Sequence, residues 1–199
     1  MDLPVYKLII NENDETGVEF VSLVTAPAIE RDFVYFNKTR KKFEIQNEEK
    51  RIIFGMAMEA DKNIYRYDDI RGEYYVYFDA DTIFEIAKKW ARGDRYDSVN
   101  LQHSDITKGL SLFESYIVDR KRGKLPPEGY EDVADGSWFL SYIVNDNEVW
   151  AKVKSGEFKG FSVEGYFDFE ETEEDKVANA IMSKLKRILE NWDGKNWAI

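Results

Sequence analysis

The segment GEFKGFSVEGYF, residues 156–167, has the composition of a β-strand with Ser162 at its centre. Strand alternation places Ser162 and Glu164 on the same face, with aromatic residues on either side of the serine. Gly160 and Gly165 predict that the backbone comes close to another part of the protein, because glycine inside a strand often marks such an approach. The segment does not fit the Gly-x-Ser-x-Gly pattern of α/β-hydrolases, so that fold gains no support. Taken alone, the segment favours a structural strand that carries a small polar residue.

The only histidine of the chain gives this serine a second interpretation. His103 lies near the end of a predicted strand that begins at Val99, beside Ser104 and Asp105. A lone histidine in such a place is more often structural than catalytic. Its position at a strand end nevertheless keeps a functional role open.

Composition limits the classes of function. Of the 199 residues, 43% are hydrophobic and 15% aromatic, which is enough for a folded core and argues against global disorder. A net charge of −11 argues against nucleic acid or an anionic membrane as the main partner. With no cysteine and one histidine we expect no disulfide, no metal site and no cofactor. No apolar run approaches the length of a membrane-spanning helix, so a soluble intracellular protein is expected.

Hydrophobic periodicity predicts a mostly β domain with flanking helices, an α+β class, over residues 1–168. An acidic linker and an amphipathic helix are predicted for residues 169–199. Strands are predicted at residues 5–10, 17–25, 43–46, 51–58, 64–67, 73–78, 99–105, 110–118, 136–144 and 156–167. Helices are predicted from Asp79 to Gly93, over residues 148–154 and over residues 177–192.

Two of these segments bear on the site. The strand 17–25 is apolar on both faces and is therefore predicted to be central in its sheet. Glu19 is the one charged residue inside it, either at the entrance of the strand or held there as a functional carboxylate. The polar segment 119–136 is predicted to be an exposed loop.

Several short segments, taken in order, resemble those of XkdF-type phage serine proteases. The similar segments are VSLVTAPAIE (21–30), IYR (64–66), YVYF (75–78), NLQH (100–103), ESYIV (114–118), GSW (136–138) and GFSVEG (160–165). These proteins resemble the prohead, or capsid maturation, proteases of tailed phages, which share a fold with herpesvirus assemblin. The resemblance covers roughly residues 3–168. It implies a herpesvirus protease-like β-barrel with flanking helices and a serine endopeptidase activity on scaffold and capsid-protein segments.

The resemblance also implies roles for two residues. Ser162 would be the nucleophile, and His103 would be the base that takes its proton and returns it to the leaving amine. Herpesvirus enzymes use a second histidine to orient the first, and this chain has none. The orienting group must therefore be a carboxylate, another hydrogen-bond acceptor, or absent.

Glu19 is the first candidate for the orienting carboxylate. In many prohead proteases a stretch like residues 21–27 follows the serine strand and has an acid at its start. Here that stretch lies at the N-terminus, as in a circular permutation. Asp105, Glu164 and Asp168 are the alternatives. The basic residues that the family usually carries after the serine are not evident.

The expected partners follow from the same resemblance. They are the scaffold and major capsid proteins, and the chain itself as a substrate of autoproteolysis, with a homodimer allowed. The expected location is the host cytoplasm, inside the assembling procapsid. Two other classes of function stay open: a non-catalytic capsid- or scaffold-associated component of the same fold, and an unrelated β-rich binding domain in which Ser162 and His103 lie far apart.

Overall fold

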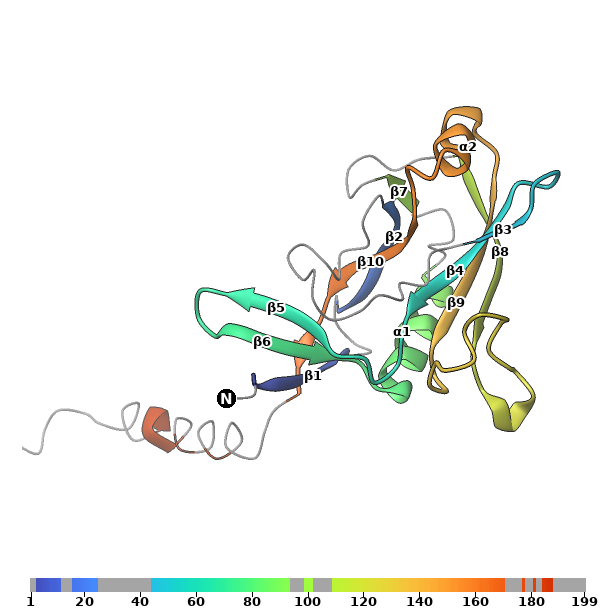
Figure 1. Ribbon diagram of the computed structural model, residues 1–199. Coiled ribbons are helices and arrows are strands. Elements are labelled where there is room, and N and C mark those ends of the chain that lie inside the picture. The colour runs from blue at the N-terminus through green and yellow to red at the C-terminus, as the bar shows by residue number, and fades with distance from the viewer. Residues whose placement is uncertain are drawn as a thin grey trace, which may run out of the picture. The chain divides into compact units, whose positions relative to one another are not determined.

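The computed structural model describes residues 3–11, 16–24, 44–93, 99–101, 109–170, 177, 181 and 184–187, with the backbone alone at positions 24, 44, 46, 100 and 101 (Figure 1). The chain divides into two compact units, Met1–Asp168 and Phe169–Ile199, and each is described by itself. The first unit holds the candidate site.

The first unit is mostly β with a few helices, as predicted. Its strands in chain order are β1 (Val5–Ile9), β2 (Gly17–Val24), β3 (Glu44–Asn47), β4 (Ile52–Met58), β5 (Ile64–Asp68), β6 (Gly72–Tyr77), β7 (Val99–Leu101), β8 (Leu110–Ile117), β9 (Trp138–Val144) and β10 (Gly160–Tyr166), followed by the two-residue β11 (Asp168–Phe169). Its helices are α1 (Ala80–Arg92), the 3-10 turn η2 (Arg120–Arg122) and α2 (Asn147–Lys154). Each predicted element that falls on described residues is therefore present, with bounds shifted by a few residues.

The predicted closed barrel is wrong for the described residues. They form three open sheets, with strand orders β11-β1-β6-β5, β10-β2-β7 and β3-β4-β9-β8. A barrel requires hydrogen bonds between its first and last strands. β10 lies near β4, but in the described part of the chain the two strands belong to different sheets and share no ladder. The herpesvirus protease fold and the circular permutation stay predictions.

β2 is the central strand of its sheet, as the sequence predicts (Figure 1). It pairs antiparallel with β10 on one side and parallel with β7 on the other. Val21 and Leu23 on one face and Ser22 on the other are fully buried, so the strand is covered on both faces. β2 therefore joins the strand of Ser162 to the strand that precedes His103 in the sequence.

Gly165 confirms the predicted close approach of the backbone. A Cβ atom built there would lie 1.9 Å from the carbonyl oxygen of Gly17 and 2.9 Å from the Cα atom of Val18. Real Cβ atoms do not come that close to other heavy atoms, so only glycine fits between β10 and the start of β2. The ladder is irregular at the same place.

Helix α1 supports the sheet of β2 from one side. Asp79 caps it, because its carboxylate accepts a hydrogen bond from the Thr82 amide at 2.8 Å. Its apolar face is buried, and Trp90 makes an edge-to-face contact with Trp138 at 5.3 Å between ring centroids. The Lys89 ammonium donates to the carbonyl oxygen of Thr16 at 2.6 Å, just before β2 begins. The helix therefore fixes the entrance of that strand.

The prediction that residues 119–136 form an exposed loop is wrong in part. Tyr130 and Val133 are 1% exposed and pack with Phe54 and Phe139 in one core cluster. The polar composition of the segment hid these two apolar anchors, because they have no regular spacing. The segment covers one face of the β3-β4-β9-β8 sheet.

We expect Arg120→Ala to destabilise this segment by about 1–3 kcal/mol, since charge-assisted hydrogen bonds contribute in that range. The guanidinium donates to the carbonyl oxygens of Glu131 and Val133, each at 3.0 Å, and pairs with Asp135. Urea unfolding followed by circular dichroism measures the change. Arg122→Ala is the matched control, because among the described residues Arg122 forms an ion pair with Asp119 alone, on the surface. Equal losses in both variants would contradict this role of Arg120.

In the second unit, residues 177, 181 and 184–187 are helical, within the predicted amphipathic helix. The other positions of that predicted helix lie outside the described residues.

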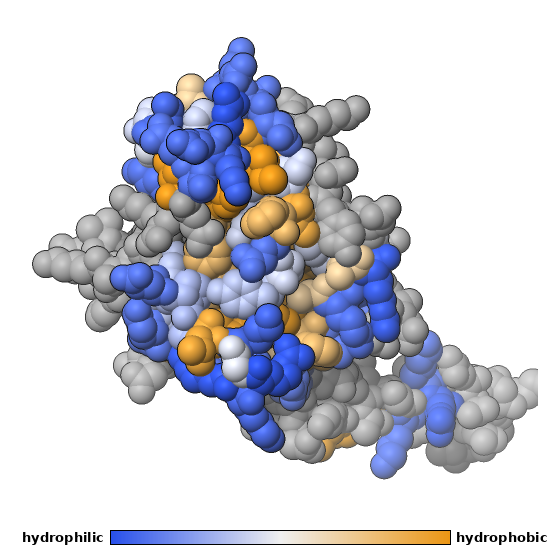
Figure 2. All heavy atoms as spheres, turned by 90° about the vertical axis from the view of Figure 1, so that its right-hand side faces the viewer, coloured by the Kyte–Doolittle hydropathy of each residue, from blue (hydrophilic) through white to orange (hydrophobic). Residues whose placement is uncertain are grey.

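None of the helices formed by described residues is both long and apolar enough to cross a membrane. On the face of the molecule in Figure 2, hydrophilic side chains surround smaller hydrophobic areas.

Candidate active site

Ser162 lies at the centre of β10 and is 7% exposed. The antiparallel register places it directly opposite Ser22 of β2. Residues opposite one another in a ladder project from the same face of the sheet, so the two serines are neighbours there. Glu164 follows two positions along β10, and its carboxylate accepts a hydrogen bond from the Ser22 hydroxyl. Ser162, Ser22 and Glu164 therefore form a polar cluster on one face of these two strands.

Ser162 lines a pocket of about 610 Å³. This volume lies in the range of ordinary ligand and substrate pockets. The walls come from β2, β4, β5 and β10, and every residue from Phe161 to Phe167 contributes. Leu8, Met58 and Phe78 supply apolar surface to the same pocket. A serine that is little exposed thus borders a space large enough for peptide side chains.

A β-bulge brings Glu19 into this pocket. Phe20 lies opposite Glu164 and Val18 lies opposite Gly165, so Glu19 has no opposite residue on β10. In a regular strand Glu19 would project from the face opposite to that of Phe20. Bulges redirect side chains in this way and occur next to active sites. Both Glu19 and Glu164 line the pocket of Ser162.

The other sequence-predicted site residues are Asp168, His103 and Asp105. Asp168 is exposed and is not among the residues that line the pocket. His103 and Asp105 lie outside the described residues. The last described residues before them form β7, which pairs with β2. In this pairing Val99 lies opposite Val21, and Leu101 lies opposite Leu23.

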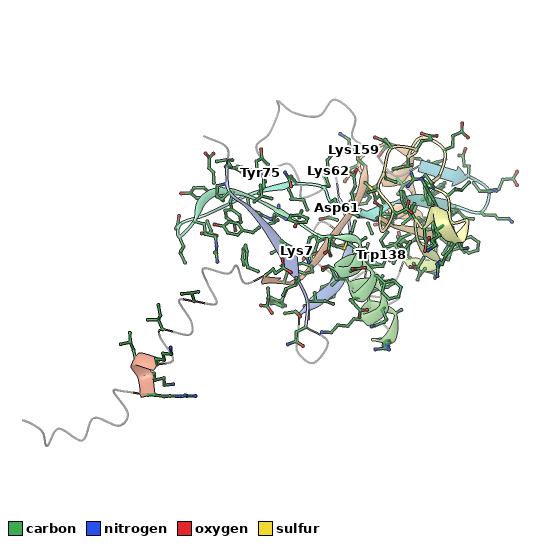
Figure 3. The ribbon with its side chains drawn as sticks, turned by 90° about the horizontal axis from the view of Figure 1, so that it is seen from below. Lys7, Asp61, Lys62, Tyr75, Trp138 and Lys159 are labelled. Atoms are coloured by element: carbon green, nitrogen blue, oxygen red, sulfur yellow. The ribbon has the colours of Figure 1, made fainter. Side chains whose placement is uncertain are left out.

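Two basic residues of the pocket were not singled out by sequence reasoning. Lys62 comes from the connection between β4 and β5, and Arg66 comes from β5 (Figure 3 labels Lys62). Arg66 is half-buried, and burial lowers the pKa of its guanidinium, which stays protonated at neutral pH. Strand alternation places Ile64 and Arg66 on one face of β5, and both line the pocket. An arginine within a predicted strand, two positions from an isoleucine on the same face, was the signal available in the sequence.

Comparison with known families gives an independent result. Residues 39–173 match the family described as "Putative phage serine protease XkdF". The chain belongs to this family. The match includes β3 to β11, and therefore Ser162, Glu164 and Arg66, as well as position 103, whereas Glu19 precedes it. No curated protein matches the chain, and no solved structure does.

Proposed function

We propose that the protein is a serine endopeptidase of phage head maturation, which cleaves scaffold and capsid-protein segments inside the procapsid in the host cytoplasm. One observation carries the proposal. In a chain that belongs to a phage serine protease family, Ser162 borders a pocket of about 610 Å³ together with three carboxylates, those of Glu19, Glu59 and Glu164. In this proposal the substrates are the scaffold protein, the major capsid protein and the chain itself.

Ser162 is the nucleophile of the proposed reaction. Its Oγ attacks the scissile carbonyl carbon while His103 takes the hydroxyl proton. The tetrahedral intermediate collapses to an acyl-enzyme when His103 gives that proton to the leaving amine. A water molecule, deprotonated by His103, then releases the acid product and regenerates the serine.

The topology of the sheet supports the pairing of Ser162 with His103. β10 and β7 flank β2, so their backbones are two strand spacings apart, about 10 Å. In the sequence, His103 follows β7 after a single intervening residue. In register, Ser162 lies opposite Ser22 of β2, and Ser22 lies opposite Asn100 of β7, three positions before His103. The proposal therefore requires that the chain after β7 brings His103 to the side of the sheet from which Ser162 projects.

Glu19 is the positioning residue that we propose for His103. Its place at the bulge, beside Ser162 in the pocket, supports this role over that of Asp168. A nearby carboxylate stabilises the imidazolium and raises the histidine pKa. Glu164 is the second choice, because its carboxylate already accepts a hydrogen bond from Ser22.

We expect Glu19→Gln to lower the pKa of His103 by about one unit, because the amide removes the negative charge beside the ring. The chain has one histidine, so an NMR titration of ¹⁵N-labelled protein follows a single imidazole. Asp168→Asn is the control and should leave the pKa unchanged. If Glu164→Gln lowers the pKa while Glu19→Gln does not, the role belongs to Glu164.

Co-expression with the scaffold and major capsid proteins of the same phage tests the function. Intact-mass spectrometry should find discrete cleavage products with the wild type and none with Ser162→Ala or His103→Ala. Cleavage products that persist in both variants, or capsids that mature without any cleavage, would contradict the proposed protease function. A non-catalytic capsid component would then be the better description.

A further inference from the structure

We propose that Arg66 is a specificity-determining residue, which binds an acidic side chain of the peptide substrate in the pocket of Ser162. The inference rests on the proposed function and names a chemical class of substrate for it. Arg66 and Ser162 line the same pocket from different sheets, on β5 and β10.

Arg66 has a single hydrogen bond in the described part of the chain. Its Nη1 donates to the carbonyl oxygen of Tyr65 at 2.9 Å, and no described carboxylate lies within ion-pair distance. Arg71 of the same β5–β6 hairpin differs, because its guanidinium pairs with Asp68 at 3.1 Å. Of these two arginines, the one that faces the pocket is the one without a described counter-ion.

A half-buried guanidinium in this position favours an anionic ligand. Its five N–H donors can satisfy a carboxylate with two parallel hydrogen bonds, and one backbone carbonyl uses little of that capacity. Leaving such a charge desolvated and unpaired is unfavourable, so a ligand carboxylate that enters the pocket gains a strong interaction. Lys62 is the second basic residue that lines the pocket.

The acidic residues of the pocket determine where such a ligand would bind. Glu19 and Glu164 come from the β2–β10 wall that carries Ser162, and they repel a ligand carboxylate there, whereas Glu59 comes from the connection between β4 and β5. Arg66 comes from the β5 wall, beside Ile64. An acidic side chain is therefore favoured at the β5 wall, with apolar surface available to its aliphatic stem.

Binding without turnover tests this subsite. Immobilised Ser162→Ala protein is mixed with randomised ten-residue peptides that are N-acetylated and C-amidated, so that only side chains carry carboxylates. Mass spectrometry of the retained peptides should show Asp and Glu enriched about tenfold over Asn and Gln, the size of a charge-assisted hydrogen bond. The enrichment should vanish in Ser162→Ala/Arg66→Gln and persist in Ser162→Ala/Arg71→Gln. Equal enrichment in both double variants would overturn the proposal.

Cleavage kinetics separate this inference from the proposed function. A retained peptide is made with Glu or with Gln at the selected position, and kcat/KM is measured for the active protein. We expect a Glu-to-Gln ratio of about ten in the wild type, near one in Arg66→Gln and partly restored in Arg66→Lys. Cleavage without a preference for acidic residues overturns this inference but agrees with the proposed protease function. Acid-selective binding without any cleavage supports the subsite and contradicts the protease function. Circular dichroism of each variant shows that it is folded.

Discussion

A Ser162→Ala variant is expected to lose all covalent reaction with diisopropyl fluorophosphate, whereas the wild type gains one diisopropylphosphoryl group per chain. The reagent captures only a serine whose hydroxyl is activated by a neighbouring base. His103→Ala should therefore slow the modification at least 10³-fold, on the order of what loss of the base costs a serine enzyme. Intact-mass spectrometry against time measures both effects, and peptide mapping locates the adduct.

Ser141→Ala is the matched control for this experiment. Ser141 is also a buried serine on a strand, but it lies on β9 and its hydroxyl donates to Glu114. This variant should react at the wild-type rate. Modification of a different serine, or equal reaction of wild type and Ser162→Ala, would remove Ser162 from the role of nucleophile.

Gly165→Ala is expected to cost more than about 3 kcal/mol of the free energy of unfolding, out of about 5–15 kcal/mol for a typical domain. The added methyl group would lie 1.9 Å from the Gly17 carbonyl oxygen and 2.7 Å from its carbonyl carbon. Both atoms belong to the backbone of β2, so relief requires that β10 and β2 separate. Urea unfolding monitored by tryptophan fluorescence measures the loss.

Gly123→Ala separates this clash from the general effect of replacing a glycine. Gly123 has a positive φ of 77°, and nothing lies within 4 Å of the position of its Cβ. Its substitution should cost only the backbone strain, about 1–2 kcal/mol. If Gly165→Ala is no less stable than Gly123→Ala, the close approach of the two strands is wrong.

The local parts of the fold could be predicted from the sequence. Asp79 followed by an apolar stripe at helical spacing marks α1, because capping and periodicity are properties of consecutive residues. The centre of the β10-β2-β7 sheet was predictable for the same reason, since a strand that is apolar on both faces must be covered on both.

The parts that depend on distant residues could not be predicted. The bulge at Glu19 exists only relative to β10, so the sequence of β2 alone gives the wrong face for this carboxylate. Whether the strands form three open sheets or a closed barrel depends on which strands hydrogen-bond to one another. Hydrophobic patterns do not specify this pairing. The role of Arg66 in the pocket depends on β5 forming a wall beside Ser162, which is a contact between residues distant in the sequence.

The pairing of Ser162 with His103 is the central claim of this account. A crystal structure of the diisopropylphosphoryl adduct measures it most directly, because the adduct holds the serine in a state close to the tetrahedral intermediate. We expect a ring nitrogen of His103 within about 3.5 Å of Ser162 Oγ or of an adduct oxygen. A histidine ring more than about 7 Å away, with no other base in reach of Ser162, would contradict the catalytic pair.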